Sequence, residues 1–375
     1  MTFLELMVLG LALFMVLPRF LENKRIEYLA LPIYIALGVC LSPIKNGTLT
    51  EGLAPIALCG FILLLFSVGL EVKLPSGKEW WPAFGKALVF YLLTFALAFA
   101  LAITSELKLM ESFICAAALS GVSVGLIFPR VDPEAKGRFG SKFIHIFIAI
   151  EIITIAVFAL AGPLLSKGAT PYLGLKIIGI VLVIFVLSRL ARKLGHRLDD
   201  WLEKTTHYRH HLLLFIVFAI AAIGERLGLS TPKTAFFLGL FMSYTRPFGS
   251  LTHSVLSTIG ERFLIPIFFL SLGLQFNWNS LSWQIALPAV LAGLALWWLR
   301  YGLFKRLLNG THTMSTLAGV NLTMVAIAVE LLGHHAESQA AIAWVLVAGT
   351  VSSLLGLLGA GGEGQVNAQK AETAQ

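Results

Sequence analysis

The segment "KFIHIFIAIEIITIAVFALAGPLL" spans residues 142–165 and decides the fold class of the chain. From Phe143 it is an almost unbroken apolar run, long enough to cross a ~30 Å hydrocarbon core as a helix. Its one acidic residue, Glu151, lies eight residues inside that helix, roughly 12 Å from its start at a rise of about 1.5 Å per residue. The segment therefore predicts a transmembrane helix with a carboxyl group near mid-membrane.

The composition extends this interpretation to the whole chain. Of the 375 residues, 57% are hydrophobic and only 13% are charged, against about 25% charged in a typical soluble domain. Apolar runs of similar length recur along residues 1–360, and we count about thirteen of them. The sequence therefore predicts an all-α polytopic membrane protein with about 13 transmembrane helices. A polar tail follows at residues 361–375, and its composition is typical of disorder.

The basic residues indicate the orientation. With thirteen spans and the N-terminus outside, most of the 28 Lys and Arg residues fall in loops on the cytoplasmic side, as the positive-inside rule requires. We therefore expect the C-terminus to be cytoplasmic. These loops also account for the net charge of +8, so membrane lipid is expected as a partner and nucleic acid is not.

Two pairs of short motifs indicate an internal repeat. "FSVGLE" at 66–71 resembles "LSLGLQ" at 270–275, and "GVS" at 121–123 resembles "GVN" at 319–321. The members of each pair are separated by an odd number of predicted helices, so the two copies run in opposite directions across the membrane. Inverted-topology repeats are typical of secondary transporters, whose sites lie near the midplane between the repeats.

Glu151 is the strongest candidate for chemistry. An ionised carboxylate at mid-membrane costs roughly 2.5–3.5 kcal/mol on insertion scales, and desolvation favours its protonated form unless a cation or water offsets the cost. The residue is therefore suited to competition between H⁺ and a metal cation. Thr154 lies one turn further along the same face and could supply an oxygen ligand. The alternative is a protonated Glu151 that is hydrogen-bonded to a neighbouring helix.

Small and polar residues interrupt two other apolar runs. Ser120 and Ser123 lie in the middle of the run 110–129, and Asn321 and Thr323 lie in the run 313–332. Close helix packing would explain either run alone. Because the repeat pairs the two segments, we favour two broken, crossing helices whose unwound backbone faces an ion.

Arg300 ends the run 281–301 and has two interpretations. It is either a cytoplasmic anchor whose side chain reaches the interface, together with Lys305 and Arg306, or an internal cation that pairs with the site carboxylate when no ion is bound. The sequence leaves both open.

At these residues the sequence resembles the monovalent cation/proton antiporters, in the branch with bacterial sodium/proton antiporters and glutathione-gated potassium efflux proteins. The matching stretches are "LLLFSVGLEV", "SGVSVGLIFPRVD", "GERLGLSTPKTAFFLGLFMS" and "IPIFFLSLGLQFN". They occur in the family's order and span most of the predicted membrane region.

The resemblance implies a thirteen-helix antiporter domain over residues 1–360. It places a core domain at about 81–165 and 281–360, and dimerisation helices at about 1–72 and 172–276. It also implies a homodimer that exchanges a cation for protons by an elevator movement. No nucleotide-binding regulatory domain is expected after the last helix, so regulation would need a separate subunit.

The resemblance also assigns site residues. The family's ion-binding carboxylate falls on Glu151, and its crossing-helix residues fall on Ser120–Ser123 and Asn321–Thr323. A basic residue of the family's eleventh helix, here the run 281–301, falls on Arg300. The family usually has Asp preceded by a polar or acidic residue at the carboxylate position, whereas here Ile150 precedes Glu151. With a single acid, we expect electroneutral exchange.

We therefore expect a homodimeric Na⁺ or K⁺/H⁺ antiporter of a bacterial inner membrane that is not an enzyme and needs no cofactor. The rivals are a cation channel, an organic-anion symporter in which Arg300 attracts the carboxylate, an intramembrane enzyme and a non-transporting sensor. An isolated Glu without an H-E-x-x-H motif is a poor basis for an enzyme. The sequence does not choose among Na⁺, K⁺ and Li⁺, since selectivity depends on the shape of the cavity.

Overall fold

The computed structural model describes residues 30–44, 47–71, 80–122, 145–158, 161, 209–226, 231–242, 260, 262–307, 319–333 and 338–372. Within these ranges the chain forms helices and short turns and no strand, so the all-α prediction is confirmed for them. Four described helices are long and apolar enough to cross a membrane: α3 (Gly47–Glu71), α4 (Trp80–Thr104), α13 (Trp283–Leu307) and α16 (Gln339–Glu372). Thirteen crossings remain a prediction.

The chain divides into two compact units. Unit 1 comprises Met1–Arg19, Ile44–Leu74 and Lys167–Ser271, and unit 2 comprises Phe20–Pro43, Pro75–Ser166 and Leu272–Gln375. Each unit therefore takes segments from both halves of the sequence. Unit 2 includes α2 (Ala30–Leu41), whereas the expected division placed residues 1–72 with the dimerisation helices.

In unit 1, α3 packs against α10 (Thr231–Met242), and both contact α9 (Arg209–Arg226). The apolar side chains at this junction are Ile62, Leu63, Phe66, Val217, Ala221, Ala235 and Met242. The helix α12 (Ile265–Leu274) belongs to unit 1 up to Ser271 and to unit 2 from Leu272. The ring of its Phe268 stacks on Phe61 of α3 with centroids 4.7 Å apart. Apolar sequence all round a helix is typical of such buried positions.

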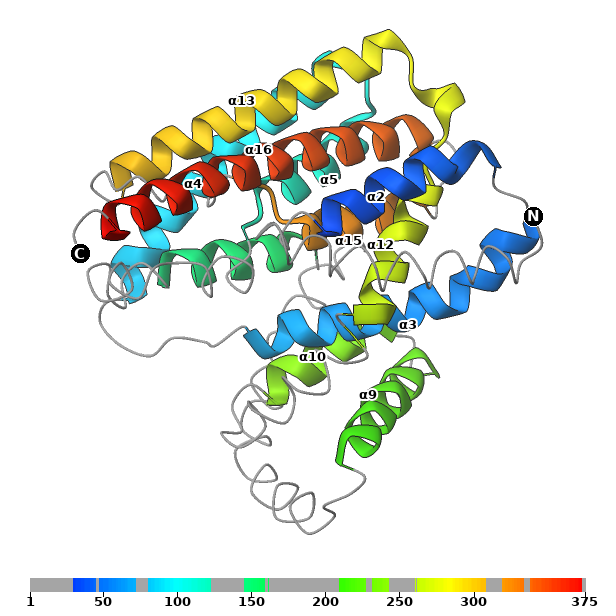
Figure 1. Cartoon of the computed structure of the whole chain (residues 1–375). Coiled ribbons are helices and arrows are strands. Elements are labelled where there is room, and N and C mark those ends of the chain that lie inside the picture. Colours follow the sequence, from blue (N-terminus) through cyan, green and yellow to red (C-terminus); the bar gives the residue numbers. More distant parts are fainter. Residues whose placement is uncertain are drawn as a thin grey trace, which may run out of the picture. The chain divides into compact units, whose positions relative to one another are not determined.

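In unit 2, α13 and α16 lie side by side, and α4 packs on both α5 (Leu109–Ser120) and α13 (Figure 1). The helix His145–Phe158 joins them through an aromatic core. The Phe304 ring of α13 lies 4.5 Å from Phe90 of α4 and 5.2 Å from Phe147, centroid to centroid. The helix α15 (Leu322–Gly333) packs against α5 and α16. This arrangement brings all the described candidate site residues into one unit.

The "FSVGLE" and "LSLGLQ" motifs make the same kind of contact. A Cβ atom added to Gly69 of α3 would collide with the carbonyl of Phe236 and the amide of Leu240 in α10. A Cβ atom added to Gly273 of α12 would collide in the same way with Ile35 and Val39 of α2. Each motif thus places a glycine where two helix backbones touch, which is the role of small residues in membrane helix packing. The repeated sequence has a repeated structural use.

Hydrogen bonds fasten the start of α16 to the corner between α4 and α5. Ser338 Oγ donates to Glu111 Oε1 at 2.8 Å, and Trp344 Nε1 donates to Ser105 Oγ at 2.9 Å. Glu111 also accepts from the amide of Lys108 at 3.2 Å and so caps the first turn of α5. The carboxylate that caps α5 therefore also bonds to the residue that precedes α16. This contact holds the start of α5 next to the start of α16.

The helix α16 continues to Glu372, through residues for which the composition predicts disorder. Extending an existing helix by one residue costs far less than nucleating a new one. The buried first half of α16 supplies that nucleus, so the polar end can continue its backbone hydrogen bonding.

Candidate functional site

Glu151 lies inside the protein. It is placed midway along the helix His145–Phe158, and only 1% of its surface is exposed. Its side chain therefore does not face the acyl chains of the bilayer. Thr154, one turn further on, is fully buried, and its hydroxyl donates to the Ile150 carbonyl at 2.8 Å. That bond uses the hydroxyl proton and leaves oxygen lone pairs of Thr154 for another donor or a cation.

Within the described residues, the helix of the apolar run 110–129 ends partway along the run, as the predicted break requires. The helix α5 stops at Ser120, whose hydroxyl donates to the Ala116 carbonyl at 2.7 Å. Gly121 follows with φ −68° and ψ 150°, an extended conformation, so the last carbonyls of α5 have no further helical amides to accept from. Ser123 lies outside the described residues.

In the apolar run 313–332, the described helix begins at the segment that the repeat pairs with the end of α5. Gly319, Val320 and Asn321 are not helical, and α15 begins at Leu322. Asn321 Oδ1 accepts from the amide of Thr323 at 2.9 Å, as an N-cap residue does. Asn321 is 2% exposed, and within the described part of the chain its Nδ2 atom has no hydrogen-bond acceptor.

Arg300 connects the two interruptions. Its Nη2 atom donates to the carbonyls of Leu119 at 2.6 Å and Gly121 at 2.8 Å, and Nη1 donates to the carbonyl of Gly319 at 2.9 Å. The residue is fully buried, with the Phe90 ring centroid 5.9 Å from its guanidinium carbon. The interfacial-anchor interpretation is therefore wrong, because the side chain points into the protein and binds main-chain oxygens of both breaks.

The guanidinium is well suited to this position. The C-terminal end of a helix carries a partial negative charge from its unsatisfied carbonyls, and α5 ends at a buried residue, Ser120. A planar group with several fixed donors can serve carbonyls on two segments at once. Arg300 thus allows two interrupted backbones to lie together in an apolar interior.

Gly121 brings three elements into contact. A Cβ atom at this position would lie 2.8 Å from Met324 Cγ and 3.2 Å from Thr154 Cγ2, both closer than ordinary van der Waals contact. The break of α5, the first turn of α15 and the turn that follows Glu151 therefore meet at a point where only a hydrogen atom fits. Thr323, next to Met324, is also buried, at 5% exposed.

The structure thus gathers Glu151, Thr154, Ser120, Asn321 and Thr323 in unit 2, with Arg300 behind the two breaks. The sequence analysis missed Met324, the aromatic neighbour Phe90 and the carbonyls that Arg300 binds. The paired "GVS" and "GVN" motifs marked two of those carbonyls, because Gly121 and Gly319 are their first residues. Buried carboxylate, hydroxyl and amide groups together with helix ends are the kinds of ligand that hold a small hard cation.

Comparison with known proteins decides the class of protein. Residues 9–370 match the model of the family described as "Sodium/hydrogen exchanger, transmembrane". The chain belongs to this sodium/hydrogen exchanger family. The expected resemblance to monovalent cation/proton antiporters is therefore confirmed, and the protein is a multi-pass membrane antiporter that exchanges cations for protons rather than an enzyme. Its ions are substrates, and family members need no cofactor.

Relatives of this exchanger carry similar names. It is 25% identical over 337 residues to the "Probable Na(+)/H(+) antiporter 3" of Methanocaldococcus jannaschii, an alignment that covers 86% of this chain and 85% of the relative. It is 24% identical to the "Ammonium/H(+) antiporter subunit AmhT" of Alkalihalophilus pseudofirmus, in an alignment that covers 85% of this chain and 83% of the relative. These alignments run through nearly the whole exchanger domain.

A solved structure supports the fold. The sodium proton antiporter MjNhaP1 from Methanocaldococcus jannaschii, determined at pH 8, superposes with a TM-score of 0.61 over 95% of each chain, at 16% identity. The exchanger therefore has the fold of this antiporter. That likeness concerns the fold alone and assigns no site residue.

Proposed function

We propose that this exchanger moves Na⁺ against H⁺ through the carboxyl group of Glu151. The observation that carries the proposal is the burial of Glu151 in the same unit as two helix breaks, with Thr154 and the α15 start meeting at Gly121. An acid in such a place must hold either a proton or a cation, because an unneutralised carboxylate is costly to bury. Competition for one carboxylate couples the two ions.

In the proposed cycle, deprotonated Glu151 binds the cation together with oxygen atoms of Thr154 and Asn321. Ser120, Ser123 and Thr323 supply further oxygens around the breaks, and Arg300 holds the broken backbones in position. Protonation of Glu151 removes its charge and releases the cation, and the protonated form returns. Since one carboxylate carries either one proton or one monovalent cation, the exchange is electroneutral.

Na⁺ is the first cation to test because several matched relatives are named Na⁺/H⁺ antiporters. K⁺ and Li⁺ suit the same oxygen ligands, and ammonium appears in the name of another relative. All four belong in one titration.

The division into two compact units supports an elevator movement. Unit 2 carries the described site residues and would move, while unit 1 would provide the scaffold and the dimer contact. We further propose a homodimer in a bacterial inner membrane, with the N-terminus outside and the C-terminus in the cytoplasm, and with any regulation supplied by a separate subunit. The units differ from the expected core and dimerisation helices at residues 20–43 and 272–276, which were expected in the scaffold and fall in unit 2.

The test is proton release from the purified protein on addition of each cation in weak buffer. We expect the wild type to release protons with Na⁺, Glu151→Gln to release none, and Glu151→Asp to retain part of the response. Glu330→Gln, which removes another carboxyl group of unit 2 at the end of α15, is the matched control and should behave as wild type. Normal release by Glu151→Gln would refute the assignment.

The same variants should be compared for exchange in proteoliposomes containing a pH dye. A conductance far above carrier turnover, or transport that depends on an organic anion and not on protons, would favour the channel or symporter alternatives.

A further inference from the structure

Two helices of unit 2 have an exposed apolar face. In the most apolar, membrane-spanning parts of α4 and α13 only 33% of the residues are buried, against 61% in the corresponding parts of α3 and α16. On α13 the exposed apolar side chains recur every three or four residues, at Trp283, Leu287, Leu291, Leu294 and Trp298. Such a stripe along a transmembrane helix is the part that acyl chains cover.

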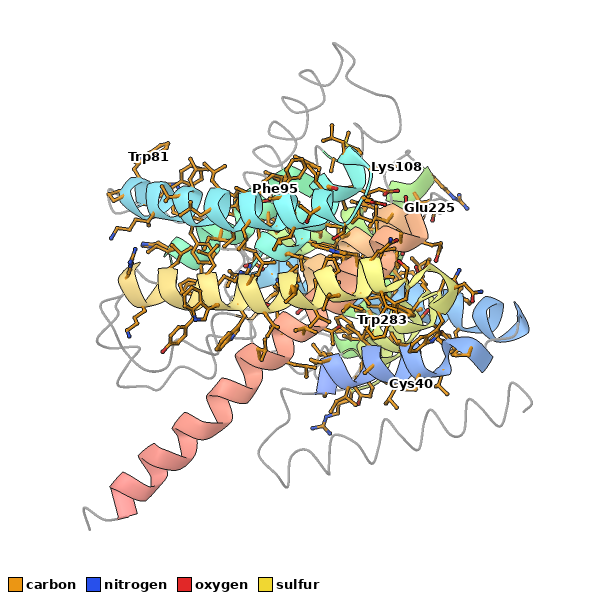
Figure 2. All side chains as sticks on the ribbon, turned by 90° about the horizontal axis from the view of Figure 1, so that it is seen from above. Cys40, Trp81, Phe95, Lys108, Glu225 and Trp283 are labelled. Atoms are coloured by element: carbon orange, nitrogen blue, oxygen red, sulfur yellow. The ribbon has the colours of Figure 1, made fainter. Side chains whose placement is uncertain are left out.

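One end of this face carries exposed tryptophan and basic side chains. At one end, Trp81 of α4 and Trp298 of α13 are 73% and 75% exposed, and Lys86, Lys305 and Arg306 are exposed as well. We call these five residues the α4–α13 basic end. Figure 2 shows Trp81 at the end of α4 that lies toward the C-terminal end of α13, while Trp283 begins α13 at the other end. The rings of Phe90 and Phe304 pack nearby, with centroids 4.5 Å apart.

Lys86 needs an explanation of its own. It is exposed inside an apolar span, where a lysine is tolerated only if its ammonium group reaches the interface. It lies about 7.5 Å along the axis from Trp81, and helical side chains lean toward the N-terminus. Its charge therefore reaches toward the level of Trp81. Tryptophan prefers that level, where lipid headgroups lie.

We propose that the α4–α13 basic end binds the headgroup of an anionic phospholipid. Clusters of Lys and Arg at the membrane surface attract anionic lipids, and the exposed apolar stripe beside the cluster accommodates the acyl chains. A second copy of the chain fits less well. A two-fold interface would place this patch against itself and would bring its basic groups together.

This position ties the lipid to the site. Lys86 is one turn from Phe90, which lies against Arg300, and Lys305 follows Arg300 on α13 by little more than one turn. A bound headgroup therefore holds the two helices that support the breaks of α5 and α15. The effect on exchange rests on the proposed function, whereas the binding itself does not.

Binding is tested with the purified protein in detergent. Native mass spectrometry should show phosphatidylglycerol and cardiolipin retained over phosphatidylcholine. Each basic side chain near an anionic surface strengthens attraction by about five-fold, so the variant Lys86→Gln/Lys305→Gln/Arg306→Gln should lose roughly 100-fold. The matched control Arg226→Gln, which removes an exposed charge at the end of α9, should retain wild-type binding.

The conservative variant Lys86→Arg/Lys305→Arg should also retain binding and separates loss of charge from misfolding. Equal retention of anionic lipid by the triple glutamine variant would overturn the proposal. A change in its oligomeric state with unchanged lipid binding would do so too, since it would identify a protein contact.

A second measurement concerns transport. In vesicles of phosphatidylcholine with one-fifth phosphatidylglycerol, wild-type exchange should exceed that in phosphatidylcholine alone by several-fold, and the triple variant should lack this difference. The triple variant should match the wild type in phosphatidylcholine alone. A lipid response that survives in the triple variant overturns the proposed site. Absence of exchange in every lipid contradicts the proposed function and leaves the binding result as the test.

Discussion

Replacing Arg300 by methionine tests how the broken helices are held together. Methionine keeps an unbranched apolar stem but is shorter and has no donor, so the carbonyls of Leu119, Gly121 and Gly319 would lose the partners that lie 2.6–2.9 Å away. Each hydrogen bond to a charged group contributes about 1.5–3 kcal/mol. Removal of the buried cation also removes its desolvation cost, so we expect a net destabilisation of about 3–5 kcal/mol.

The expected result is a lower melting temperature and loss of exchange. For a chain of this size the change corresponds to a fall of about 5 °C, which tryptophan fluorescence of the detergent-purified protein can follow. Arg300→Lys keeps the charge but concentrates its donors at one point, so it cannot span three carbonyls. We expect it to melt between the wild type and Arg300→Met.

Cation-induced proton release, measured on the same samples, separates stability from transport. Arg226→Gln is the control for loss of an exposed charge and should leave melting and proton release unchanged. If Arg300→Met melts with the wild type and releases protons normally, the reasoning is refuted, because the carbonyls would then have no need of the guanidinium.

Two further predictions concern contacts near the site. Gly121→Ala should reduce exchange because its Cβ would lie 2.8 Å from Met324 Cγ and 3.2 Å from Thr154 Cγ2. The double variant Gly121→Ala/Met324→Ala should regain part of the exchange in the vesicle assay. Equal activity of Gly121→Ala and wild type would show that the contact is unimportant. Glu111→Gln should lower stability by about 1–3 kcal/mol in thermal unfolding, because Ser338 and the Lys108 amide lose a carboxylate acceptor. Unlike Glu151→Gln it should keep proton release, and loss of release at unchanged stability would contradict a purely structural role.

The sequence alone was sufficient for the class of protein and for a candidate site residue. A composition with few charges permits only a membrane protein, and a carboxyl group in the middle of an apolar span needs a proton, a cation or a hydrogen-bonding partner. Glu151 could be singled out for that reason from its position in the apolar run. The paired motifs around Gly121 and Gly319 indicated two interrupted helices. Small and polar residues at matching positions of a repeat are unlikely to occur by chance in both copies.

Tertiary structure decided what the polar and small residues do. The alternatives for Arg300 have the same sequence signal, a basic residue late in an apolar run, and only the fold places its guanidinium against three carbonyls from two segments. Glu111 caps the first turn of α5 and also accepts from Ser338, a contact that joins residues 227 positions apart. Such partners depend on which helices become neighbours, and helix neighbours are set by packing across the whole chain rather than by local pattern.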